Sequence, residues 1–157
     1  MRKSSFADMN CSIAQTLEIV GEWWTLLILR DVFLGIRRFD DFVERLGISR
    51  NVLADRLEKL VAADVLDRRP YDEGRGRYDY VLTEKGRDLW PVLTTLREWG
   101  DRWIFGEGNE PIVLVHRSCG EVTHLRHTCD QCGEALDARS VVVRPGPGSA
   151  VGDAASP

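Results

Sequence analysis

Four residues toward the C-terminus have the types and the spacing of a metal site. His116-Arg-Ser-Cys119-Gly supplies one pair of ligands, and Cys129-Asp-Gln-Cys132-Gly supplies a second pair after nine intervening residues. One imidazole and three thiolates make the closed tetrahedral set of a structural zinc site, in which no coordination position stays open for catalysis. We therefore expect one zinc ion per chain, bound by His116, Cys119, Cys129 and Cys132, with a role in folding.

Other interpretations of these residues remain open. His124 and His127 lie close by in the sequence and are alternatives for the fourth ligand. The three cysteines could also be structural thiols without metal. A redox-active Cys-x-x-Cys pair is a further alternative, although such motifs occur in a βαβ context that this sequence lacks.

Cys11 stands apart from the other three cysteines, at the expected start of the first helix. The positive end of the helix dipole favours a thiolate there, and Arg2 and Lys3 are close in sequence. Cys11 is thus a candidate redox sensor. The alternative is a small, partly buried apolar residue. A sensing disulfide would have to join Cys11 to its mate in a second copy, because no other cysteine lies near it in sequence.

Residues 39–82 contain the elements that would position a functional surface. Phe39, Phe42, Val43 and Leu46 are spaced by three and four residues and predict a helix with one buried stripe. Gly47 is expected to end this helix, and Ile48 to fill the turn. Ser49 is a good N-cap for a second helix over residues 49–62, with Leu53, Leu57, Leu60 and Val61 on its buried face. Two short helices across such a turn are typical of a helix-turn-helix that lays its second helix in the major groove.

A hairpin is predicted directly after this helix pair. Residues 65–71 and 77–82 carry β-branched and aromatic side chains, and Asp72-Glu-Gly-Arg-Gly76 supplies turn residues between them. Gly74, Arg75, Gly76 and Arg77 form a flexible tip that presents guanidinium groups, as a phosphate or minor-groove contact requires. Helix, turn, helix and basic hairpin in this order predict a winged helix.

The remaining helices are predicted to complete the domain and a dimer interface. Residues 11–20 and 22–34 should form two helices separated by Gly21, the second of them apolar nearly all round. Thr83 should cap a long helix that runs to about Phe105 and is kinked or divided at Pro91. Along it, apolar residues spaced by three and four residues resemble a coiled-coil seam; they are Leu89, Val92, Leu96, Trp99 and Trp103.

Composition is that of an ordinary globular protein. The 157 residues are 43% hydrophobic and 29% charged, with a net charge of −4, which argues against a purely electrostatic nucleic-acid binder. Residues 45–77 nevertheless hold eight cations against six anions. The N-terminus lacks the apolar segment of a signal peptide, so we expect a cytoplasmic protein.

The sequence resembles the HxlR-type family of MarR-like bacterial transcriptional regulators. The resemblance covers residues 9–105 and rests on segments that begin at Cys11, Gly21, Arg38, Gly47, Tyr78 and Pro91. It implies a homodimeric winged helix that binds palindromic operator DNA, and we expect a repressor. It also implies that Cys11 occupies the place at which some members sense oxidants or electrophiles.

The expected fold class is α+β, mainly α. A winged helix-turn-helix domain over residues 1–105 should be followed by a linker (106–111), a small zinc-ribbon-like β unit (112–144) with a strand at 112–115, and a disordered tail (145–157). Recognition helix 49–62 and wing 71–78 should bind double-stranded DNA. The expected DNA-contacting residues are Ser49, Arg50, Asn51, Asp55, Arg56, Lys59, Arg75 and Arg77.

No catalytic constellation is recognisable in the sequence, so we expect a regulator and not an enzyme. A small-molecule or redox effector would suit such a regulator. The alternative function is a winged-helix protein–protein interaction module that uses the C-terminal ribbon as its docking face.

Overall fold

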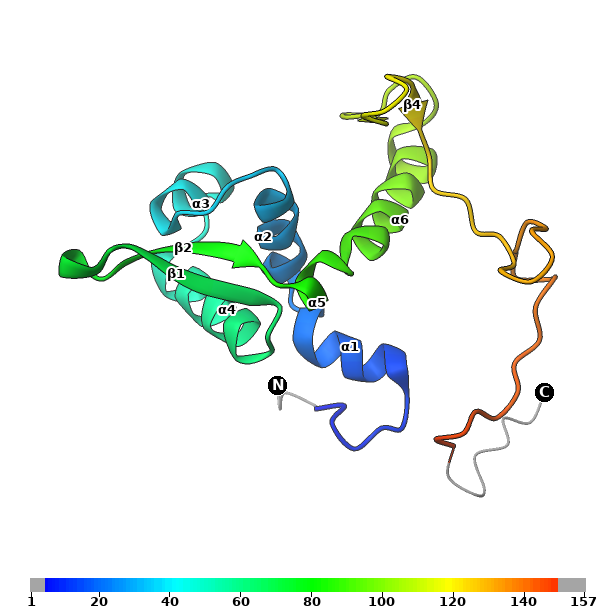
Figure 1. The fold of residues 1–157 in the computed structure, drawn as a ribbon, viewed down its shortest axis with the longest axis horizontal. Coiled ribbons are helices and arrows are strands. Elements are labelled where there is room, and N and C mark those ends of the chain that lie inside the picture. The colour runs from blue at the N-terminus through cyan, green and yellow to red at the C-terminus, as the bar shows by residue number, and fades with distance from the viewer. Residues whose placement is uncertain (1–4, 150–157) are drawn as a thin grey trace. The chain divides into compact units, whose positions relative to one another are not determined.

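The computed structural model describes residues 5–149, and the chain divides into two compact units, Met1–Leu93 and Thr94–Pro157. Each unit is described by itself. The elements, of which Figure 1 labels α1–α6, β1, β2 and β4, are α1 (Ser12–Val20), α2 (Trp23–Phe33), α3 (Phe39–Leu46), α4 (Arg50–Ala62), β1 (Leu66–Asp72), a 3-10 turn (Glu73–Arg75), β2 (Arg77–Leu82), α5 (Glu84–Arg87), α6 (Trp90–Gly100), a π-helical turn (Asp101–Phe105), β3 (Leu114–Val115) and β4 (Val122–Thr123).

The first unit is built on a single apolar core. Helices α2, α3 and α4 and the start of β1 contribute side chains that are almost fully buried, and these follow the predicted apolar stripes. Burial of this kind is the main force that holds the helices together. The buried apolar residues of the core are Val20, Ile28, Leu29, Val32, Phe42, Ile48, Leu53, Leu57, Leu60, Val65 and Leu66.

The turn between α3 and α4 has the conformation that its residues predict. Gly47 adopts the left-handed region (φ 63°), and its N–H donates to the carbonyl of Val43 at 3.0 Å, which ends α3. The Ser49 hydroxyl accepts the N–H of Val52 at 3.4 Å and caps α4. Ile48, between them, is 3% exposed. The helix-turn-helix is therefore fixed by local chemistry at both helix ends.

The wing is an antiparallel pair of strands, β1 and β2. Leu66 pairs with Leu82 and Arg68 with Tyr80, and the register shifts between Pro70 and Asp72. A bulge at this place increases the local twist of the strand and re-aims the tip of the hairpin. The segment before α3 adds to the sheet, because the Tyr80 N–H donates to the carbonyl of Arg37 at 2.8 Å.

The predicted long helix is divided, as expected from Pro91. Thr83 caps α5 by accepting the N–H of Gly86 at 3.0 Å, and α5 ends at Arg87. Helix α6 begins at Trp90, so Pro91 lies in its first turn, where a missing N–H costs no helical hydrogen bond.

The second unit holds little regular structure and almost no buried surface. Strands β3 and β4 pair over two residues each, so the strand expected at 112–115 is confined to Leu114–Val115. The boundary between the two units lies at Leu93/Thr94, before the linker expected at 106–111. The end of α6 therefore belongs to the second unit, where Glu98 accepts the N–H of Leu125 at 2.9 Å. Residues 141–149 contain neither helix nor strand, and residues 150–157 of the expected tail lie outside the described residues. Among the described residues, no helix is long and apolar enough to cross a membrane.

Candidate nucleic-acid interface

The N-terminal turn of α4 presents polar side chains to solvent. Ser49, Arg50 and Asn51 are all exposed, while the opposite face of the helix enters the core. The Arg50 guanidinium is oriented by two neighbours on α3. Its Nη1 lies 2.8 Å from Oδ1 of Asp40, and its Cζ lies 4.9 Å from the centre of the Phe39 ring. Arg50 is thus held at the exposed end of the predicted recognition helix, where bases of a major groove would be read.

Farther along α4 the expected contact residues form a charge network. Arg56 is only 15% exposed, and its Nη2 lies 2.9 Å from Oε2 of Glu22, which precedes α2. Its other terminal nitrogen contacts Asp55, and Lys59 reaches the same Asp55 carboxylate at 2.8 Å. Arg56 therefore links α4 to the residue before α2, whereas the side chains of Asp55 and Lys59 are half exposed.

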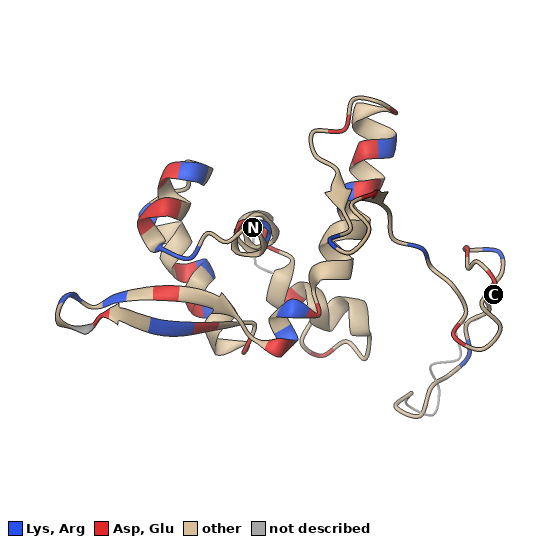
Figure 2. Cartoon of the chain, turned by 45° about the horizontal axis from the view of Figure 1, so that its top comes forward, with Lys and Arg blue, Asp and Glu red and all other residues tan. Residues whose placement is uncertain are grey.

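The tip of the wing carries exposed cations. The Arg75 side chain is 72% exposed, and its Nε lies 3.8 Å from Oδ2 of Asp72. Arg77, at the start of β2, is exposed as well. Figure 2 shows basic (blue) and acidic (red) residues side by side at this end of the hairpin. The tip holds as many carboxylates (Asp72, Glu73) as guanidinium groups, but the exposed Arg75 and Arg77 can still approach a phosphate backbone or a minor groove.

Two further arginines of the wing region were not predicted as contact residues. Arg38 stacks on Tyr71 (4.7 Å to the ring centre) and lies 3.8 Å from Asp79 of β2, while Arg68 stacks on the ring of Tyr78 at 4.6 Å. The only sequence signal for Arg38 is its place before a helix, because its partners are more than thirty residues away. Both guanidinium groups add cations beside the strands of the wing, where Asp67 and Asp79 also lie.

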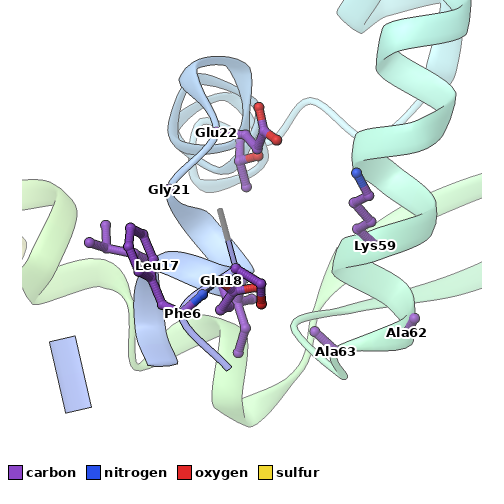
Figure 3. A pocket seen from close by; sticks show the side chains of 11 residues that line it. Phe6, Leu17, Glu18, Gly21, Glu22, Lys59, Ala62 and Ala63 are labelled. Atoms are coloured by element: carbon purple, nitrogen blue, oxygen red, sulfur yellow. Dashed lines mark hydrogen bonds between the residues drawn. The ribbon is translucent and has the colours of Figure 1, made fainter. Parts of the chain in front are cut away.

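A cleft of about 650 Å³ lies between α1, α2 and the C-terminal end of α4 (Figure 3). Leu17 and Glu18 line it from α1, and Lys59 and Ala62 line it from α4. A small molecule bound here would contact the first helix and the predicted recognition helix at once.

Cys11 is exposed and is the N-cap residue of α1, with its side chain in no capping hydrogen bond. Its backbone carbonyl accepts the N–H of Gln15 at 3.0 Å, in the first turn of the helix. The exposed position leaves the thiol accessible to reagents. Arg2 and Lys3, which we expected nearby, lie outside the described residues.

The four expected metal ligands are brought together as two pairs. Nδ1 of His116 lies 3.3 Å from Sγ of Cys119. Cys129 and Cys132 interact through their side chains, and the backbone N–H groups of Cys132 and Gln131 lower the pKa of the Cys129 thiol. Within residues 5–149, however, no three His, Cys, Asp or Glu side chains lie close enough to share one metal ion.

Comparisons with known proteins agree with the winged-helix geometry. The HxlR-like helix-turn-helix family matches residues 19–107. The chain is 46% identical over 137 residues to Rv3095 of Mycobacterium tuberculosis, an uncharacterized HTH-type transcriptional regulator, and the match covers 87% of each protein. It is 33% identical over 106 residues to the HTH-type regulator sll1512 of Synechocystis, covering 67% of this chain and 78% of that one.

Solved structures give the same result. The structure of PA1607, a candidate transcription factor, is similar with a TM-score of 0.81 at 34% identity, and covers 91% of this chain and 100% of its own. The redox regulator HypR in its reduced form has a TM-score of 0.54 at 28% identity, and covers 58% of this chain and 91% of its own. The likeness to PA1607 thus continues beyond the winged helix. The chain belongs to the HxlR-like helix-turn-helix family and is a DNA-binding transcriptional regulator.

Proposed function

We propose that the protein is a homodimeric repressor that binds two-fold symmetric operator DNA through α4 and the wing. One observation carries the proposal. The exposed N-terminal turn of α4 and the exposed arginines of the wing tip belong to one compact unit, whose α3–α4 turn is capped at both ends. A recognition helix and a ribbon fixed relative to each other can follow the adjacent grooves of one duplex.

Within this interface we assign different roles to different side chains. Arg50 and Asn51 are placed to read base edges, since arginine pairs with guanine and asparagine with adenine. Lys59, Arg75 and Arg77, together with Arg38 and Arg68, are suited to phosphate contacts. Arg56 is better suited to positioning, because its contact with Glu22 holds α4 in place.

The dimer is proposed from apolar side chains that the chain itself leaves uncovered. Trp23 at the start of α2 is 91% exposed, and Ile13 of α1 is 72% exposed. On α6 and the turn after it, Trp99 and Trp103 are 57% and 64% exposed, in line with the expected seam. Large aromatic surfaces of this kind are typical of interfaces between subunits. A dimer would place two recognition helices about 34 Å apart, which suits a palindrome.

The effector is proposed to act on α1. Oxidation of the exposed Cys11 is one route, and HypR, which resembles this chain, is named as a redox regulator. A small molecule in the cleft between α1 and α4 is the other. Filling the cleft by Ala62→Trp should weaken the response to a small-molecule inducer and leave DNA affinity without inducer unchanged; unchanged induction would remove the cleft from the proposal.

The proposal includes a cytoplasmic location, where operator DNA is found, and no enzymatic activity. None of the relatives and structures named above gives support to the alternative of a protein–protein interaction module. The direct test is a mobility-shift and footprinting assay on DNA upstream of the protein's own gene. We expect a protected site with two half-sites about one helical turn apart. Binding to this DNA no tighter than to unrelated DNA of equal length would contradict the proposal.

A further inference from the structure

Two loops of the C-terminal unit have the same backbone pattern. In the first loop, residues 116–121, the His116 N–H donates to the carbonyl of Glu121 at 2.9 Å. The His116 carbonyl accepts the N–H of Gly120 at 2.8 Å. The residue at the start of the loop is therefore fixed from both sides, and the loop closes on itself over one tight turn.

The second loop, residues 129–134, repeats this arrangement position by position. The Cys129 N–H donates to the carbonyl of Glu134 at 2.8 Å, and the Cys129 carbonyl accepts the N–H of Gly133 at 2.8 Å. Gly120 and Gly133 occupy equivalent positions with nearly equal positive φ angles, 75° and 77°. A positive φ strains other residue types, so both loops depend on glycine for the same turn. Such agreement between loops of different sequence indicates a shared role.

The side chains of each loop point to that role. In the first loop, Nδ1 of His116 lies 3.3 Å from Sγ of Cys119. Tetrahedral zinc, with Zn–N near 2.1 Å and Zn–S near 2.3 Å, requires an N···S separation of about 3.6 Å. The observed pair is already close to one edge of such a tetrahedron. In the second loop, the N–H groups of Gln131 and Cys132 point to the sulfur of Cys129, an environment that suits a metal-bound thiolate.

The C-terminal unit also needs a cross-link of some kind. Among the described residues from 94 onward, Thr94 is the only buried one. Apolar side chains such as Val115, Val122 and Leu136 are 38–54% exposed, so apolar burial contributes little to holding the unit together. Small modules of this kind are usually stabilised by disulfides or by metal.

We propose that the two loops bind one zinc ion between them, with His116, Cys119, Cys129 and Cys132 as its ligands. The two pairs do not converge in the described structure, so the second loop must approach the first when the metal binds. Residues 124–127, which connect β4 to the second loop, contain neither helix nor strand. A bend there would release the hydrogen bond from the Leu125 N–H to Glu98 and would leave the pairing of β3 with β4 intact.

His116 is favoured over the two nearby histidines by its surroundings. His124 lies 3.8 Å from Glu98 and belongs to an acidic group on the side of α6 and the linker. His127 lies two residues before the second loop, outside the six residues that repeat the backbone pattern of the first loop. Only His116 lies at the first position of a loop with a cysteine three residues later.

The test uses the full-length protein, expressed in zinc-supplemented medium and purified without chelator. Elemental analysis should give about one zinc per chain. Replacement by Co²⁺ should give the visible bands of a tetrahedral site and a thiolate charge-transfer band. Cys119→Ser, Cys129→Ser and His116→Gln should each lower the bound metal at least tenfold under a competing chelator.

Matched controls separate ligand loss from general damage. Cys11→Ser removes the remaining cysteine of the chain, and His127→Gln removes a histidine beside the second loop; both should keep about one zinc per chain. Far-ultraviolet circular dichroism should be unchanged in every variant, since the helices lie outside both loops. Parent protein with less than about a tenth of an equivalent of zinc would overturn the proposal, as would full metal retention in Cys129→Ser or a Cys129–Cys132 disulfide in the isolated protein.

Discussion

Glu22 and Arg56 form an ion pair of 2.9 Å that joins the N-cap of α2 to the middle of α4. Arg56 is largely buried, whereas Glu22 is about one third exposed, so solvent screens part of the attraction. Glu22→Gln should lower the free energy of unfolding by about 1 kcal/mol, because a largely buried guanidinium loses one of its two carboxylate partners and keeps Asp55. Urea denaturation measures this change. The matched control is Glu44→Gln on the exposed side of α3, which should change stability by less than about 0.5 kcal/mol. Equal effects of the two variants would show that the pair does not position α4.

Gly47 provides a test of the helix-turn-helix turn. Its φ of 63° is unfavourable for alanine, although open space surrounds the position at which a Cβ would lie. Gly47→Ala should therefore cost about 1–2 kcal/mol through backbone strain alone. Gly100→Ala is the control, because Gly100 has helical dihedral angles and similar open space; it should be neutral or stabilising by up to about 1 kcal/mol. Thermal unfolding of both variants decides whether the turn has the conformation described.

The elements that local chemistry specifies were predictable from the sequence. Gly47, Ser49 and Thr83 act at helix ends through hydrogen bonds to residues a few positions away. Pro91 predicts a division of the long helix even though the apolar pattern continues past it. The winged helix follows from these signals and from the apolar stripes. Their positions agree with the structure within one or two residues.

Features that depend on partners far along the chain were not predictable. Arg56 has the spacing of an exposed contact residue on α4, but Glu22, thirty-four residues earlier, draws it inward. Arg38 reaches the wing through pairing of its segment with β2, which no local pattern indicates. The zinc site remains a prediction, since its spacing is clear in the sequence while its two pairs lie apart in the structure.

Dimerisation should depend on exposed tryptophans. Light scattering at micromolar concentration should give twice the chain mass of 17.8 kDa. Trp23→Ser or Trp103→Ser should weaken the dimer by about 2 kcal/mol, or roughly thirtyfold in Kd, as expected for aromatic residues at the centre of an interface. Val143→Ser, which alters a side chain that is 92% exposed in the extension, is the control. A parent protein that stays monomeric would remove the support for palindromic binding.

Cys11 should be the residue through which oxidants act. Peroxide or diamide should release the parent protein from operator DNA, and Cys11→Ser should remain bound at the same dose, because its hydroxyl cannot form a disulfide. Zinc content has to be followed in parallel, so that oxidation of Cys119, Cys129 or Cys132 is not mistaken for sensing. If Cys11→Ser leaves the operator at the same oxidant dose as the parent, then Cys11 is not the oxidant sensor.

The most direct test of operator recognition by α4 compares Arg50→Ala with Arg75→Ala in salt-dependent binding to operator and scrambled duplexes. Arg50→Ala should lose about 1–3 kcal/mol on the operator and much less on scrambled DNA, because it removes a base contact at the start of α4. Arg75→Ala should weaken both duplexes alike and reduce the salt slope by about one. Operator binding by Arg50→Ala as tight as that of the parent would contradict recognition through the N-terminal turn of α4.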